Sequence, residues 1–121
     1  MCFFIHINHE EKKVANRDIT CYKCLYNDFT SPYKGKLYKL NKLYRSSICI
    51  TRTICKTPII TKGLHSYSCK RFAIRQMNSY GILVKGIIPK GSKYYYNPDR
   101  HEYVSNQIIL QEVIKRKQTI I

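Results

Sequence analysis

The pattern of hydrophobic and polar positions along this chain predicts mostly strands, with one helix inserted among them. Residues 18–29, DITCYKCLYNDF, mix β-branched residues, Cys and Tyr, and predict a first strand. Residues 36–46 carry leucines that suit a helix, but an alternation that favours a strand runs through Lys36, Tyr38, Leu40 and Lys42. Residues 48–61 are rich in Ile and Thr and predict further strand segments, in which Pro58 excludes a central hydrogen-bonded position.

One segment changes period and predicts the main helix of the fold. Ser66 can cap this helix and Gly81 can close it. Its core-facing side would carry Cys69, Phe72, Ala73, Gln76, Met77 and Tyr80, and its basic residues fall away from that side, namely Lys70, Arg71 and Arg75. Buried strands follow at residues 82–88 and 103–115. We therefore expect an α+β fold, a small and mostly antiparallel sheet with one main helix.

The two last strands are joined by IIPKGSKYYYNPDR, residues 87–100. Pro89 and Gly91 predict a tight turn between them. If the tyrosines continue as a strand, Tyr94 and Tyr96 share one face and Tyr95 lies on the other. The three tyrosines therefore cannot all serve one surface.

Length and cysteine content indicate a single intracellular domain. A chain of 121 residues fits one domain with one modest core. We expect residues 1–16 and 115–121 to be peripheral or frayed. The apolar start of the chain is too short to span a bilayer and lacks the features of a signal peptide. Six cysteines without a secretory context predict reduced thiols in a cytoplasm.

Charge is the strongest compositional signal. The chain has 22 Lys and Arg against 7 Asp and Glu, a formal net charge of +15. Residues 29–98 contain no acidic residue, so basic side chains there cannot be neutralised by local ion pairs. Such a field attracts anions. An AT-rich genome is the alternative source of the many lysines, but it explains the missing acids less well.

Basic and aromatic residues cluster in the second half and predict a binding surface. Lys and Arg bind phosphates, while Tyr offers a flat face on which a base can stack. The candidate ligand-binding residues are His65, Ser66, Arg71, Arg75, Lys85, Lys90, Lys93, Tyr94, Tyr95 and Arg100. His65 and Ser66 would stand at the positive end of the predicted helix, where an anion can bind. The alternatives are that these two merely cap the helix and that the tyrosines belong to a solvated hairpin.

The pair Cys21-x-x-Cys24 is a candidate for metal binding. This spacing suits zinc, but a structural site needs a second pair of ligands, and Cys49 and Cys55 have five residues between them rather than two. In a strand, Cys21 and Cys24 also face opposite sides. We therefore expect buried free cysteines, with no metal and no cofactor.

Several pieces of the chain together resemble a group of small bacteriophage and prophage accessory proteins. These pieces are DITCYKCL, TSPYKG with YKLNKLY, GLHSY, and VKGIIPKGSKYY with YVSNQIILQEVI. The group carries a Ser-Pro-Tyr segment, a Gly-aromatic-His-Ser element and a closing strand preceded by Val-Ser. Leu64 stands here where an aromatic residue is common in the group, and Asn41 where Gly is frequent. The resemblance implies a viral accessory role, and such proteins include inhibitors of host defence.

Charge, aromatic residues and resemblance lead to one expected function and three alternatives. We expect a phage-encoded, non-enzymatic homo-oligomer in the host cytoplasm that binds an anionic nucleotide-type ligand and inhibits antiviral defence by sequestering a nucleotide immune signal. The first alternative is a basic nucleic-acid-binding protein and the second is a virion component. The third is a small enzyme in which His65, Tyr94 to Tyr96 and Glu112 resemble the His, Tyr and Glu of ADP-ribosyltransferases.

Overall fold

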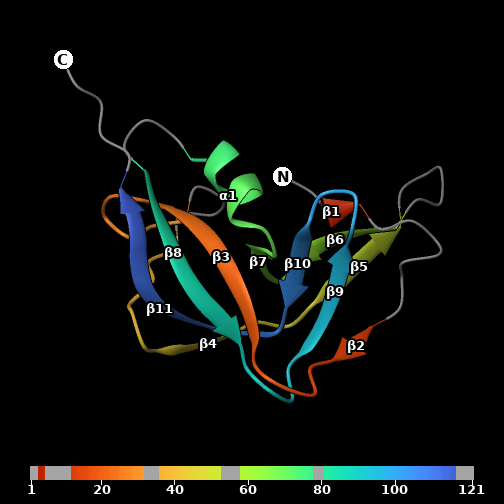
Figure 1. The fold of residues 1–121 in the computed structure, drawn as a ribbon. Coiled ribbons are helices and arrows are strands. Elements are labelled where there is room, and N and C mark those ends of the chain that lie inside the picture. The colour runs from red at the N-terminus through yellow and green to blue at the C-terminus, as the bar shows by residue number, and fades with distance from the viewer. Residues whose placement is uncertain (1–2, 5–11, 32–35, 53–57, 78–80, 117–121) are drawn as a thin grey trace.

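The computed structural model describes residues 3–4, 12–31, 36–52, 58–77 and 81–116, and it is built mainly from strands (Figure 1). The strands of the first half are β1 (Phe3–Phe4), β2 (Lys13–Val14), β3 (Ile19–Tyr26), β4 (Leu43–Arg45), β5 (Cys49–Arg52) and β6 (Pro58–Lys62). The second half contains β7 (Leu64–Tyr67), helix α1 (Lys70–Arg75), β8 (Gly81–Ile88), β9 (Lys93–Asn97), β10 (Glu102–Ser105) and β11 (Gln107–Arg116).

An antiparallel sheet of eight strands in the order β2-β9-β10-β7-β3-β8-β11-β4 forms the body of the fold. β3 and β7 are joined through a single residue pair, Tyr22 with Tyr67, so the sheet bends sharply there into two four-stranded halves. This bend allows β10 to run into β11 through Asn106 alone, although three strands separate them in the sheet order. A second sheet has the order β1-β6-β5.

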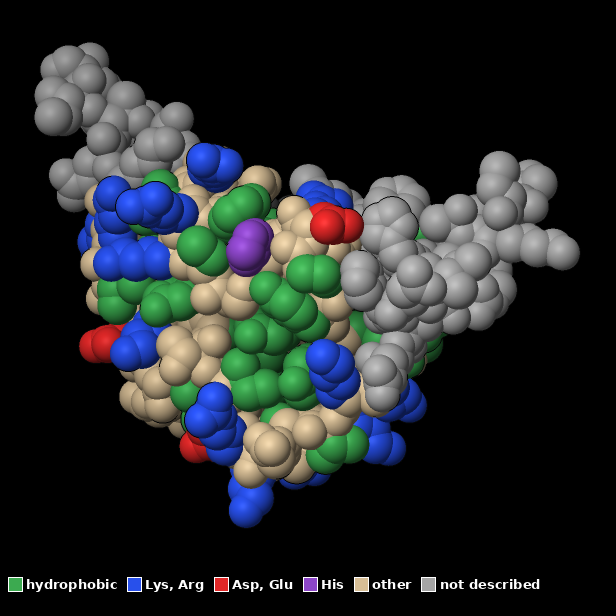
Figure 2. Space-filling view, turned by 45° about the vertical axis from the view of Figure 1, so that its right-hand side comes forward, with side chains coloured by type: hydrophobic (Ala, Val, Ile, Leu, Met, Phe, Trp, Pro, Cys, Tyr) green, Lys and Arg blue, Asp and Glu red, His purple; other side chains and the backbone are tan. Residues whose placement is uncertain are grey.

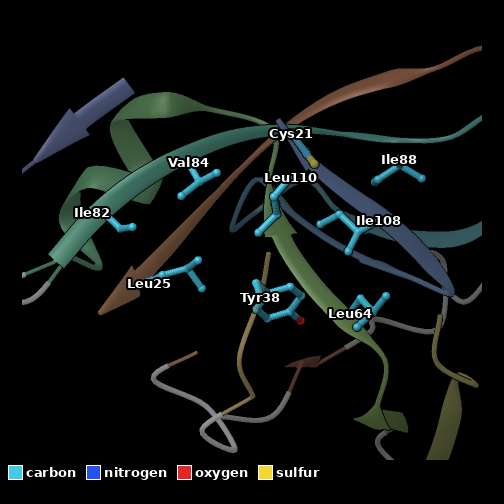
Figure 3. Packing of buried hydrophobic residues seen from close by; sticks show 9 residues of the cluster. All are labelled: Cys21, Leu25, Tyr38, Leu64, Ile82, Val84, Ile88, Ile108 and Leu110. Atoms are coloured by element: carbon cyan, nitrogen blue, oxygen red, sulfur yellow. The ribbon is translucent and has the colours of Figure 1, made fainter. Parts of the chain in front are cut away.

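The main core fills the angle between the two halves of the large sheet. Figure 3 shows side chains from β3, β7, β8 and β11 converging here around Tyr38, and the cluster comprises Cys21, Leu25, Tyr38, Leu64, Ile82, Val84, Ile88, Ile108 and Leu110. We call the side of the sheet that carries these residues the core face and the opposite side the back face. Burial of this apolar surface is the main source of stability.

The back face is covered by two different elements. Tyr95 and Val104, on the β9 and β10 half, pack against Ile60 of the second sheet. On the other half, Cys24 and Leu83 pack against Ala73 and Met77 around α1. Cys21 therefore belongs to the core face and Cys24 to the back face, which confirms the prediction that the two thiols face opposite sides.

The predicted α+β fold with one main helix is wrong, because strands dominate and α1 has six residues. The helix neither begins at Ser66 nor ends at Gly81: Ser66 lies in β7, Cys69 is the N-cap without a side-chain cap, and Gly81 begins β8. The Leu64–Tyr67 segment pairs with β10 instead, which satisfies its backbone groups within the sheet. Lys70, Arg71 and Arg75 are exposed, as predicted. Tyr80, predicted on the helix, lies outside the described residues.

The turn predicted at Pro89 and Gly91 is confirmed. The Ser92 amide donates a 3.0 Å hydrogen bond to the Pro89 carbonyl, and Gly91 has a φ of +90°, which glycine adopts without steric cost. The alternation of the tyrosines is confirmed as well, because Tyr95 is buried on the back face while Tyr94 and Tyr96 are half-buried on the other.

The segment 36–46 is a strand only at its end, in β4, whereas Tyr38 is a core residue in irregular backbone. Pro58 is the first residue of β6, a position that tolerates proline. Cys55 lies outside the described residues. Within the described ranges, no helix has the length and apolar character needed to cross a membrane.

Gly86→Ala is expected to lower the free energy of unfolding by about 1–3 kcal/mol through overpacking. A β-carbon at Gly86 would collide with the Ile109 carbonyl oxygen, and it would approach the Leu110 side chain to 3.0 Å. Chemical denaturation measures the loss. Lys85→Ala, on the same strand but pointing to the back face, is the control and should lose under about 1 kcal/mol. If Gly86→Ala leaves the free energy of unfolding unchanged, β11 moves away from β8 without cost. The register shift in β11 between Leu110 and Glu112 is where it would do so.

Candidate functional site

Three tyrosines form a row of rings on the core-face side of β9 and β10. The Tyr94 and Tyr103 ring centroids are 5.8 Å apart at 77°, and those of Tyr96 and Tyr103 are 4.9 Å apart at 39°. Strand pairing creates the row, since Tyr103 lies directly opposite Tyr96, and Ser105 opposite Tyr94. All three side chains are half-buried. Each tyrosine is therefore fixed by its neighbours and still partly accessible.

The row of rings continues from Tyr96 to the helix. The Tyr96 hydroxyl lies 3.5 Å from Nδ1 of His101, and the His101 ring stacks on Phe72 of α1 with centroids 4.4 Å apart. The Ser68 hydroxyl is 3.2 Å from the Tyr96 hydroxyl. We call the five side chains Tyr94, Tyr103, Tyr96, His101 and Phe72 the aromatic strip.

The loop between β9 and β10 brings His101 into the strip. The Asn97 side chain accepts a 3.0 Å hydrogen bond from the Asp99 amide, which closes a turn after Asn97. His101 then has a φ of +50°, and its carbonyl accepts a 2.8 Å hydrogen bond from the Ser68 amide. The sequence Asn-Pro-Asp-Arg thus reverses the chain and fixes His101 beside the end of β7.

Positive charges stand at both ends of the aromatic strip. The Arg75 guanidinium lies 5.3 Å from the Phe72 ring centroid. At the other end, Lys13 of β2 lies directly opposite Tyr94 and is exposed. Burial, followed by the neighbouring Tyr96 and Tyr94, raises the pKa of Tyr103 to about 12. Figure 2 shows a face of the molecule on which hydrophobic side chains gather in the middle with Lys and Arg side chains around them.

The structure distributes the predicted site residues over several surfaces. Tyr94 and Arg75 lie at the aromatic strip, together with Tyr96, which alternation placed on the same face as Tyr94. The Tyr95 side chain is buried in the core and Ser66 is 1% exposed. Lys93 pairs with Val14 and points to the back face, away from Tyr94. Four other basic residues lie elsewhere. Arg71 on α1 and Lys90 in the β8–β9 turn are exposed, and Lys85 on β8 and Arg100 in the β9–β10 loop are half-buried.

His65 belongs to a separate polar cluster on the back face. Its Nδ1 lies 3.4 Å from Oε2 of Glu102, and Nε of Arg100 lies 3.8 Å from Oε1 of that carboxylate. Glu102 is 6% exposed. Glu112, the glutamate considered for an enzyme, lies opposite Lys85 in β11, three strands from β7 in the sheet order. The combination of His65 and Glu112 is therefore not assembled.

Sequence reasoning missed four residues of the site: Lys13, Phe72, His101 and Tyr103. Helical spacing assigned Phe72 to the buried side of a longer helix. For Tyr103 the available signal was strand alternation with the buried Val104. His101 lies in the loop before β10 and had no local signal.

Cys21 and Cys24 are buried and have free thiols. Burial raises the pKa of Cys21 to about 12 and that of Cys24 to about 11. Both thiols are therefore protonated at neutral pH. The described ranges contain no group of three or more His, Cys, Asp or Glu side chains suited to a metal ion.

Comparison of the chain with protein-family models, with curated proteins and with solved structures finds no match.

Proposed function

We propose that the protein binds an anionic nucleotide-type ligand, a short single strand whose bases stack along the aromatic strip. The observation that carries this proposal is the continuous strip of five rings between Lys13 and Arg75. Aromatic side chains that follow a positively charged path are the usual platform for single-stranded nucleic acid. The net charge of +15 supports the same partner.

An extended strand suits the strip better than a single nucleotide. Neighbouring ring centroids are 4.4 to 5.8 Å apart where they are in contact, so one base covers only part of the row. A duplex keeps its bases stacked on each other and offers few free π-faces. The strip therefore favours unpaired bases, with phosphates held by Lys13, Arg75 and the surrounding field.

Salt dependence separates a strand from a small ligand. A fluorescent single-stranded octanucleotide is expected to bind in low salt, and its affinity should fall with a log–log slope near about −2 if about three phosphates are neutralised. A matched duplex should bind more weakly, and a mononucleotide or cyclic dinucleotide should show a shallower slope. Fluorescence anisotropy measures all of these. Equal binding of duplex and single strand, or no binding of any nucleotide probe in low salt, would overturn the proposal.

The resemblance to phage accessory proteins also predicts that a homo-oligomer sequesters a nucleotide immune signal in the host cytoplasm. This role stays a prediction. Its binding chemistry is compatible with the aromatic strip. Native mass spectrometry of the protein from infected cells is the test, and a mass above that of the chain would identify a retained small nucleotide.

A further inference from the structure

We propose a second site next to the aromatic strip, a hollow that binds the terminal phosphate of the strand. The hollow has a volume of about 420 Å³ and is lined by Arg45, Ser46, Ser47, Asn106 and Gln107. This inference rests on the proposed function, because it names which part of the ligand the hollow takes.

Strand pairing and backbone hydrogen bonds build the hollow at the link between β10 and β11, beside the end of β4. Arg45 at the end of β4 lies directly opposite Gln107 at the start of β11. The Ser46 amide donates a 3.0 Å hydrogen bond to the Asn106 carbonyl. The segment after β4 is thereby held against the link between β10 and β11.

The lining residues offer hydrogen-bond donors and positive charge. Oδ1 of Asn106 accepts a 2.9 Å hydrogen bond from the Lys93 amide, which leaves Nδ2 as the donor of that carboxamide. The Ser46 hydroxyl donates to the Ser47 carbonyl, so the Ser47 hydroxyl is the second donor. Arg45 adds a guanidinium fork that matches phosphate. None of the described residues that line the hollow is a carboxylate.

The hollow lies at the Tyr94 end of the aromatic strip. Asn106 directly follows Ser105, the residue opposite Tyr94, and its amide donates a 3.0 Å hydrogen bond to the Lys93 carbonyl. Arg45 and Gln107 alternate with the core residues Tyr44 and Ile108, so their side chains lie on the back-face side of the sheet. A strand stacked on Tyr96, Tyr103 and Tyr94 therefore reaches the hollow by passing the last ring and crossing over the link at Asn106. At the opposite end the strip stops at Phe72 and Arg75, so the two ends of the bound strand meet different surroundings.

A terminal phosphate fits this hollow better than an internal one. A phosphomonoester carries about −1.5 to −2 charges at neutral pH and three acceptor oxygens, whereas a phosphodiester has one charge and two such oxygens. Arg45, Ser47, Asn106 and Gln107 can serve three oxygens at once. The hollow is open to solvent, so the terminal sugar can extend out of it.

Three octanucleotides of one sequence test the inference: one with a 5′-phosphate, one with a 3′-phosphate and one with neither. One of the two phosphorylated strands is expected to bind on the order of tenfold more tightly than the unphosphorylated strand, the increment of one charge-assisted contact. Arg45→Gln should abolish this preference and change the affinity for the unphosphorylated strand less than about twofold. Arg116→Gln removes the same charge from an exposed position of β11 and should keep the preference.

The outcomes separate this inference from the proposed function. If none of the three strands binds, the aromatic strip does not act as proposed. If all three strands bind equally well, binding to the aromatic strip is supported and the proposed phosphate site is wrong. Preference retained in Arg45→Gln would also overturn the site. Inorganic phosphate gives an independent reading, because its titration should shift the side-chain amide NMR signals of Asn106 and Gln107 in the wild type and leave them unshifted in Arg45→Gln.

Discussion

Replacement of the buried Lys23 by Met is expected to raise the free energy of unfolding by about 2 kcal/mol at neutral pH. Lys23 is 8% exposed on the core face of β3. Its ammonium donates a 2.6 Å hydrogen bond to the His65 carbonyl and lies 5.4 Å from the Tyr38 ring centroid. Burial lowers its pKa from 10.5 to about 8, although Cys21, Cys24 and Glu102 act in the opposite direction.

The size of the effect follows from that pKa. A folded-state pKa of about 8 against an unfolded value of 10.5 corresponds to about 3 kcal/mol against the charged side chain. Met has a similar volume but cannot donate the hydrogen bond to the His65 carbonyl. The loss of this hydrogen bond reduces the gain in stability by about 1 kcal/mol. The protonated lysine is therefore a net cost to the fold, and an apolar side chain of similar length removes it.

The advantage of Lys23→Met should disappear as the pH rises. Below about pH 8 both the folded and the unfolded chain hold the Lys23 proton, so the cost is present in full. Between about pH 8 and pH 10 the folded protein has released it and the unfolded chain has not, so the wild type gains stability, by about 2–3 kcal/mol relative to the variant. Cys21 and Cys24 lower the free energy of unfolding above about pH 9. Their pKa values are raised in the folded protein, so the folded protein keeps thiol protons that the unfolded chain loses.

Chemical denaturation of both proteins across this pH range measures the effect. The difference between them removes most of the contribution of the cysteines, because burial, not Lys23, is the main cause of their pKa shifts. Lys85→Met, half-buried on the back face opposite Glu112, is the matched control and should change stability by under about 1 kcal/mol. A difference between the wild type and Lys23→Met that stays constant from about pH 7 to pH 10 would contradict the burial of a charged Lys23.

Local alternation allowed the strands of this protein to be predicted, but not their partners. Residues 18–29 and 82–88 show the apolar pattern of strands, and β3 and β8 lie there. The sharp bend at Tyr22 and Tyr67 comes from pairing between distant segments, which no local pattern encodes. The helix was overestimated because Ala73 and Met77 do have helical spacing, whereas Leu64–Tyr67 gains more from pairing with β10.

The candidate site was predicted in part for the same reason. Alternation was enough to separate Tyr94 and Tyr96 from Tyr95. The two residues that extend the row, His101 and Phe72, come from a loop and a helix, and only the tertiary fold stacks them. Lys93, next to Tyr94 in sequence, lies on the other face, so proximity along the chain misled the choice of basic partners.

The double variant Tyr94→Leu and Tyr96→Leu is expected to lose single-strand binding by about 30-fold or more. Each base stacked on an aromatic ring contributes about 1–3 kcal/mol, so the loss of two rings removes at least about 2 kcal/mol. Leucine keeps apolar bulk beside Tyr103 but has no flat π-face. Fluorescence anisotropy with the octanucleotide measures the affinity, and thermal denaturation checks that the variant is folded.

Two control variants isolate stacking as the cause. Tyr94→Phe with Tyr96→Phe keeps both rings and removes only the hydroxyls, including the one near Ser68 and His101, so binding should stay within about fivefold of the wild type. Tyr26→Leu removes an exposed ring from the end of β3, outside the strip, and should leave binding unchanged. If the Leu and Phe double variants bind equally well, the rings do not stack with bases, and the basic residues alone hold the strand.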